Sequence, residues 1–160
     1  MNKKMLTALN EQVNEELASA YIYLSMSAYF SAEGWKGMST WMYKQFEEEL
    51  AHAGKFSSYI VDRGGRIELG ALDKPAHKWD SPLDVYKAAY KHECHISKCV
   101  HDLVKLARAE GDIATENMLA WFVSEQVEEE AAAMEVVTNL EKIAGKSTAL
   151  FMYDQVLGNR

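Results

Sequence analysis

The sequence has little of what commonly interrupts, cross-links or anchors a chain. It contains 2 prolines and 9 glycines in 160 residues, so long helices can run without a break. Its 2 cysteines, Cys94 and Cys99, are too few for a disulfide scaffold. No secretory signal is recognised before the first expected helix, so we expect a reducing, cytoplasmic location. No apolar run reaches the roughly 18 residues that a membrane span needs, so we expect no membrane partner.

Positive charge is also in short supply. The chain carries 17 Lys and Arg against 24 Asp and Glu, which gives a net charge of −7. This balance argues against nucleic acid as a main partner and suits a protein that binds cations. A hydrophobic content of 48% is ample for a core, and the length favours a single domain over residues 1–160.

Four long segments have the apolar period of helices, and short breaks separate them. We expect helices over about residues 2–32, 38–62, 82–109 and 112–144. Ser81 and Pro82 have the residue types of an N-cap and a first-turn position. The expected fold is all-α, a four-helix bundle over about residues 2–144 followed by a fifth helix over about 147–157. That last helix is too short to be stable without docking.

The connection between the second and third helices is unusually long. It has about 17 residues, contains Pro75 and lacks a helical period. Fully extended it reaches roughly 56 Å, whereas a 28-residue helix is roughly 42 Å long. The connection can therefore return along the whole bundle and make the third helix parallel to the second. Its alternating Ile67 and Leu69 fit a short edge strand or a subunit contact, and a packed surface loop fits equally well.

Polar residues interrupt the apolar stripe of each expected helix near its middle. The stripe of the first helix runs through Leu6, Leu9, Val13, Ala20, Tyr23, Leu24, Ser27 and Phe30. The interruptions are Glu16 in the first helix, Glu49 and His52 in the second, Glu93 in the third, and Gln126 and Glu129 in the fourth. Glu16 precedes Glu49, and Glu93 precedes Gln126, by the same 33 residues. We therefore expect all six side chains to meet at one height in the bundle.

The charge of this group indicates what occupies it. Its four glutamates sum to −4, and four carboxylates in one core cannot all stay ionised unaided. Two divalent cations would balance them, and oxygen-rich ligation with one imidazole suits iron or manganese better than tetrahedral zinc. Positions left open on the metals would admit dioxygen. Tyr23 lies on the stripe of Glu16 and is either a hydrogen-bond partner of a ligand or a core tyrosine.

Two other interpretations stay open from the residues alone. The stretch from Glu47 to His52 also fits a solvated acidic run with one satisfied histidine. The whole set also fits a non-catalytic helical scaffold with a structural metal site.

Four motifs resemble those of the ferritin family, specifically the bacterial non-haem ferritins. They are Asn10-Glu11-Gln12-x3-Glu16, Glu48-Glu49-x2-His52, Tyr90-Lys91-His92-Glu93 and Ser124-Glu125-Gln126-x-Glu128-Glu129-Glu130. The resemblance covers essentially the whole chain. It implies a hollow homo-oligomeric shell of about 24 subunits with closed symmetry. It also implies a ferroxidase, which oxidises Fe(II) with dioxygen or hydrogen peroxide as partner and stores a ferric mineral inside the shell.

The resemblance also assigns roles to residues. The six interrupting residues correspond to the ligands of a di-iron site, with Glu49 as the bridge. From its position on the stripe of Glu16, we also expect Tyr23 to belong to the catalytic group. Glu48, Glu125 and Glu128 correspond to contributors to a third iron site that shares Glu129; without the resemblance they would be a solvated acidic face. Leu50 stands where bacterioferritins have a haem-ligating methionine. We therefore expect no haem.

Two weaker candidates lie elsewhere. His92, His95 and Cys99 share one outward helix face and fit either a metal site or ordinary surface and packing roles. Glu116, near the start of the fourth helix, resembles a channel-lining position of ferritins.

Overall fold

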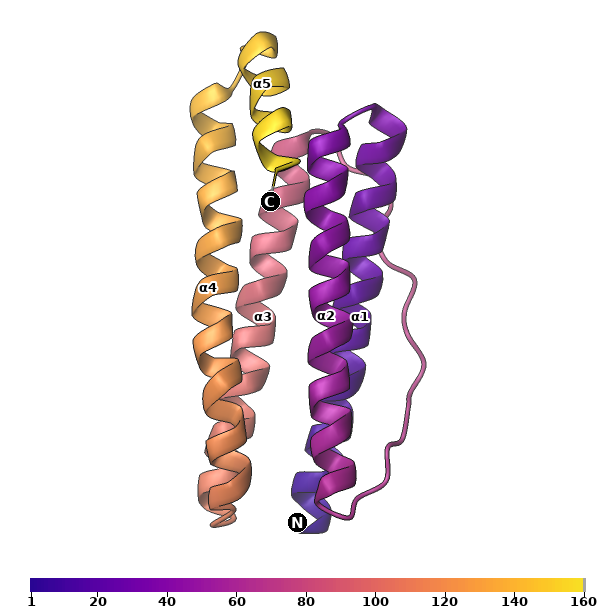
Figure 1. The fold of residues 1–160 in the computed structure, drawn as a ribbon, viewed down its shortest axis with the longest axis vertical. Helices are drawn as coiled ribbons and strands as arrows, with labels where there is room; N and C mark the ends of the chain where they lie inside the picture. The colour runs from indigo at the N-terminus through magenta and orange to yellow at the C-terminus, as the bar shows by residue number, and fades with distance from the viewer. Residues whose placement is uncertain (160) are drawn as a thin grey trace.

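The computed structural model describes residues 1–159 and has five helices within them (Figure 1). The four long helices are α1 (Lys3–Glu33), α2 (Lys36–Asp62), α3 (Pro82–Ala109) and α4 (Ile113–Ile143), and α5 (Ser147–Leu157) is short. The helices therefore lie where the apolar period and the break residues predict them, to within about two residues at each end. Among these described helices, none has a stretch long and apolar enough to cross a membrane.

The long helices form two antiparallel pairs, α1 with α2 and α3 with α4 (Figure 1). After α2 the chain runs back along the whole bundle before α3 begins, so α3 is parallel to α2 (Figure 1). The predicted topology is thus confirmed. Helix α5 packs near the start of α2, at the end of the bundle where the crossover also arrives (Figure 1).

The ends of the long helices are set by local hydrogen bonds. The side chain of Asn2 accepts a bond from the amide of Met5 at the start of α1, and Ser81 accepts one from Asp84 at the start of α3. Asp112 does the same for Thr115 in α4. Such caps satisfy amides that have no partner inside a helix. Helix α1 ends at Gly34, whose φ of 84° is easily adopted only without a β-carbon.

The crossover is held against α1 by polar side chains along that helix. Asn10 donates to the carbonyl of Arg66 and accepts from the amide of Glu68, and further up the helix Tyr29 donates to the carbonyl of Trp79. Within the described residues the crossover pairs with no strand. The edge-strand interpretation therefore does not apply to this chain alone, whereas the packed loop does.

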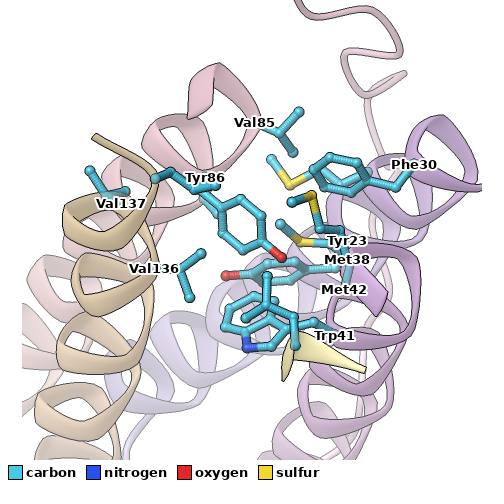
Figure 2. Packing of buried hydrophobic residues seen from close by; sticks show 13 residues of the cluster. Tyr23, Phe30, Met38, Trp41, Met42, Val85, Tyr86, Val136 and Val137 are labelled. Carbon is cyan, nitrogen blue, oxygen red and sulfur yellow. The ribbon is translucent and has the colours of Figure 1, made fainter. Parts of the chain in front are cut away.

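The core consists of two apolar clusters. One is built around Tyr23, Phe30, Trp41, Met42 and Tyr86 near the α5 end (Figure 2), and the other contains Met5, Leu9, Phe56, Ile60, Val100 and Phe122. Most of the predicted stripe residues are buried, but Leu24 is 37% exposed. That prediction was wrong because Leu24 follows the buried Tyr23 directly, and one residue of advance turns a side chain about 100° around the helix. Most of the buried residues outside these two clusters are polar.

Candidate metal centre

A polar layer separates the two apolar clusters and receives side chains from all four long helices. The six predicted residues all lie in it, and each has an exposed fraction of 6% or less: Glu16, Glu49, His52, Glu93, Gln126 and Glu129. On every helix, buried apolar residues flank the polar position on both sides. The same helical period that builds the apolar clusters therefore turns these polar groups inward.

The α1 and α2 side of the layer brings two carboxylates to one imidazole. Ligand atoms of Glu16, Glu49 and His52 lie within 4.8 Å of one another. Nδ1 of His52 is 3.4 Å from Oε2 of Glu49, one helical turn earlier. Three such atoms at this separation can bind a common ion.

The α3 and α4 side is organised by hydrogen bonds to carboxylates. Tyr23 donates to Oε1 of Glu93, and the amide of Gln126 donates to Oε2 of Glu93 over 3.1 Å. His52 links the two sides, because its Nδ1 faces Glu49 and a ring nitrogen of His52 also lies within 4.8 Å of ligand atoms of Glu125 and Glu129. The two interpretations of Tyr23 both hold at once: the ring packs in the core and the hydroxyl contacts a candidate ligand.

Two buried amides were not predicted from the sequence. Gln12 donates to Glu16 over 2.8 Å, and Gln45 donates to Glu129 over 2.7 Å. Gln12 lies four residues before Glu16, and Gln45 lies four residues before Glu49. Residues four apart share a helix face, so this spacing could have predicted that both amides face the polar layer. These amides orient carboxylates without adding charge.

The layer has four carboxylates and no buried cation to neutralise them. Among the described residues that are buried, none is a lysine or an arginine. Both oxygens of Glu49 and Oε2 of Glu16 are buried without a hydrogen bond. Buried anionic oxygens of this kind are costly unless a cation or a proton meets them. The residues present therefore fit divalent metal ions.

The same crowding shifts the acidity of the layer. Burial, followed by the charge of Glu49, raises the pKa of Glu16 well above its usual range. Burial and the charges of Glu93 and Glu129 raise the pKa of Glu49 well above its usual range too. The raised pKa values favour the protonated forms of these carboxyl groups, and a bound cation would compete with those protons.

The three acidic residues expected around the layer differ in placement. Oε1 of Glu125 is 3.9 Å from Nε2 of His52, so Glu125 reaches the layer. Glu48 is partly buried and Glu128 is exposed, both beside it on α2 and α4. Glu125 thus contacts a buried residue of the layer.

The remaining candidates lie away from the layer. His95 and Cys99 lie close together with Glu15 of α1. His92 instead turns towards Ser19, whose hydroxyl is 2.7 Å from its Nε2. Glu116 accepts a 2.7 Å bond from Arg108 near the turn between α3 and α4.

Comparison with known proteins agrees with this arrangement. A family model described as a ferritin-like domain matches residues 6–143. The chain is 42% identical over its full length to the bacterial non-heme ferritin of Bacteroides fragilis, covering 99% of that protein. It is 36% identical to the bacterial non-heme ferritin of Staphylococcus aureus, again over its full length and 96% of the relative.

Solved structures agree as well. An open pore ferritin from the archaeon Archaeoglobus fulgidus superposes with a TM-score of 0.99 at 46% identity, covering 100% of this chain and 99% of that one. A bundle of four long helices with a parallel second and third helix, a polar layer of carboxylates and a full-length match together place this chain: it belongs to the ferritin family.

Proposed function

We propose that this ferritin stores iron and that its polar layer is the ferroxidase centre, where two Fe(II) ions bind as substrates within one subunit and are oxidised. Four buried carboxylates in the layer, with no buried lysine or arginine among residues 1–159, carry this proposal. They supply −4, which two Fe(II) ions balance. Iron also suits a donor set of carboxylate oxygens with one imidazole.

The contacts support a role for each residue. Glu16 and His52 hold one ion, and Glu93 with Glu129 hold the other. Glu49 bridges the two ions. Its ligand atom lies within 4.8 Å of those of Glu16 and His52, and the charges of Glu93 and Glu129 act on its carboxylate from the other side of the layer. Gln126 and Tyr23 hold the carboxylate of Glu93 from two directions. Gln12 and Gln45 position Glu16 and Glu129.

The oxidation follows from this arrangement by charge and electron count. Two Fe(II) ions supply two electrons, which reduce one dioxygen to the level of hydrogen peroxide with two protons from solvent. Each ion gains one positive charge, and a cluster of carboxylates stabilises Fe(III) more than Fe(II). Two ions held side by side deliver both electrons to one dioxygen molecule without diffusing. Fe(III) then leaves for the mineral.

Further expectations belong to this proposal. Glu48, Glu125 and Glu128 contribute to a third iron site that shares Glu129. About 24 copies of the chain, each a single domain over residues 1–160, close into a hollow shell. The protein works in the cytoplasm and carries no haem, since Leu50 has no lone pair to offer a haem iron.

Rapid mixing of Fe(II) with the aerobic protein tests the proposal, in parallel for wild type, Glu49→Gln and Glu47→Gln. Glu47 is exposed on the same helix, so its variant is a matched control for the loss of one charge. We expect fast oxidation in wild type and Glu47→Gln and at least a tenfold loss in Glu49→Gln. Equal rates in all three would exclude Glu49 as a ligand and would favour a scaffold with a structural metal site.

A further inference from the structure

Outside the polar layer, one group of side chains brings three different metal-binding atoms together. Glu15 of α1 and His95 and Cys99 of α3 have ligand atoms within 4.8 Å of one another. Nε2 of His95 is 3.0 Å from Oε2 of Glu15 and 3.6 Å from Sγ of Cys99. Both contacts therefore converge on a single ring nitrogen. His95 and Cys99 are one helical turn apart, and Glu15 reaches them from the neighbouring helix.

Hydrogen bonds within the group satisfy the two contacts unequally, because the sulfur of a thiol is only a weak acceptor for an N–H group that it would share with the carboxylate. A neutral imidazole has one hydrogen, carried by one of its two nitrogens. If Nε2 carries it, the nitrogen donates to Glu15 and cannot accept from the thiol of Cys99. If Nε2 lacks it, the nitrogen accepts from the thiol but has nothing to donate to the carboxylate. A cation at the centre would satisfy carboxylate, imidazole and thiolate together.

The spacing of these atoms is already close to that of a metal site. With metal–sulfur and metal–nitrogen bonds of about 2.3 and 2.0 Å, two tetrahedral ligands lie about 3.5 Å apart. The distance from Nε2 of His95 to Sγ of Cys99 is 3.6 Å. Oε2 of Glu15 is 3.0 Å from Nε2 of His95, a few tenths of an ångström closer than two ligands of a tetrahedral metal ion. The exposed side chain of Glu15 can move to make up this difference.

The site is open to solvent on one side. The side chains of His95 and Glu15 are 52% and 41% exposed, so an ion can reach them. Both line a groove of about 710 Å³ that the crossover covers on its other side. His92 also lines this groove, but its Nε2 is engaged with Ser19, so it leaves the fourth position of an ion to water.

We propose that Glu15, His95 and Cys99 form a second metal site, distinct from the ferroxidase centre, that binds a divalent ion of the Zn²⁺ or Co²⁺ type. One thiolate and one imidazole select ions softer than Mg²⁺ or Ca²⁺, which prefer oxygen ligands alone. The ferroxidase centre has no sulfur ligand among its residues. The two sites can therefore be told apart by whether a thiolate binds the metal.

Titration of the assembled, reduced protein with Co²⁺ tests the proposal, because thiolate-bound Co²⁺ has a near-ultraviolet charge-transfer band that oxygen and nitrogen ligands do not produce. We expect the band to reach the amplitude of one thiolate-bound Co²⁺ per chain, although the ferroxidase centre also takes up part of the added Co²⁺. Added Zn²⁺ should remove it. Ferroxidase activity plays no part in this readout, so a failure here leaves the proposed function untouched, and a failure of the ferroxidase test leaves this site untouched.

The other cysteine provides the matched control. Cys94 lies beside Tyr90 on a different face of α3, away from Glu15. We expect Cys94→Ser to keep the band and Cys99→Ser to abolish it. Glu15→Gln and His95→Gln replace exposed side chains and should weaken Co²⁺ binding at least tenfold while the shell stays assembled on size exclusion. A wild type without the band, a band that survives Cys99→Ser, or unchanged affinity in both exposed variants would overturn the proposal.

Discussion

The carboxylate of Asp154 accepts a 2.8 Å hydrogen bond from the backbone amide of Met38, which links α5 to the first turn of α2. Helix α2 has no side-chain cap of its own, because its N-cap residue is Trp35. Asp154 is 2% exposed and therefore serves as the missing cap from a distant part of the chain. Its negative charge also lies at the favourable end of the helix dipole.

Loss of this cap should loosen both helices. We expect Asp154→Ala to lower the free energy of unfolding by about 1 kcal/mol, the usual value of an N-cap. Hydrogen exchange of the amides in the first turn of α2 should become faster. Asp154→Asn keeps an acceptor oxygen and is the control. If the alanine variant exchanges like wild type, the contact does not hold α5 in place.

The same docking depends on the absence of a side chain at Gly37. A β-carbon at this position would lie 1.6 Å from the carbonyl oxygen of Asp154, so the two helices could not keep their present distance. We expect Gly37→Ala to release α5, seen as faster proteolysis within residues 147–157. Gly54, whose β-carbon would meet nothing within 4 Å, provides a control in the same helix as Gly54→Ala. Equal proteolysis of both variants would contradict the prediction.

Gln45 should matter for iron binding although it carries no charge. Its amide holds Oε2 of Glu129 at 2.7 Å, and it is fully buried. We expect Gln45→Leu to weaken Fe(II) binding about tenfold, the lower end of what such orienting groups contribute. Anaerobic titration with Fe(II) measures this, with Glu47→Gln as the control. Unchanged affinity in Gln45→Leu would mean that Glu129 keeps its position without the amide.

The stability of the metal-free protein should depend on pH through the buried glutamates. Burial and neighbouring carboxylates raise the pKa of Glu49. A carboxyl group with a higher pKa in the folded than in the unfolded protein costs nothing below the unfolded value of about 4.3. Its cost grows as the pH rises from there towards the folded pKa, and it persists above it. The metal-free protein should therefore lose stability between mildly acidic and neutral pH.

Glu49→Gln removes this cost while it keeps the shape of the side chain. At neutral pH and with chelator present, we expect the variant to be more stable by about 1 kcal/mol per subunit, with no difference below about pH 4. With Fe(II) under anaerobic conditions the order should reverse, because the variant lacks the proposed bridging ligand. Thermal melts measure both, and a variant that is less stable under all conditions would refute the charge argument.

The proposed third iron site can be tested separately from the proposed ferroxidase centre. Glu48 is partly buried and Glu128 is exposed, and they directly precede Glu49 and Glu129 in the sequence. We expect the double variant Glu48→Ala, Glu128→Ala to bind two Fe(II) ions per subunit and to change the ratio of iron oxidised to oxygen consumed. Oxygen-electrode measurements give this ratio, with Glu47→Ala as the control. A ratio equal to wild type would make both residues simple surface charges.

The helices and the composition of the centre follow from the amino-acid sequence alone. Burial of an apolar stripe requires a period of 3.6 residues, so any polar residue in that period must turn inward with it. This is why Glu16, Glu49, Glu93 and Glu129 can be identified from their positions along the chain. The length of the crossover, which is enough to span the bundle, likewise predicts that α3 is parallel to α2.

The pairing of side chains across helices depends instead on how the helices pack. Gln45 and Glu129 are 84 residues apart, Glu15 joins His95 from another helix, and Asp154 caps α2 from 116 residues away. Helical periodicity orients a side chain relative to its own axis, but it carries no information about the rotation and height of the neighbouring helix. Those follow from the packing of the two apolar clusters as a whole.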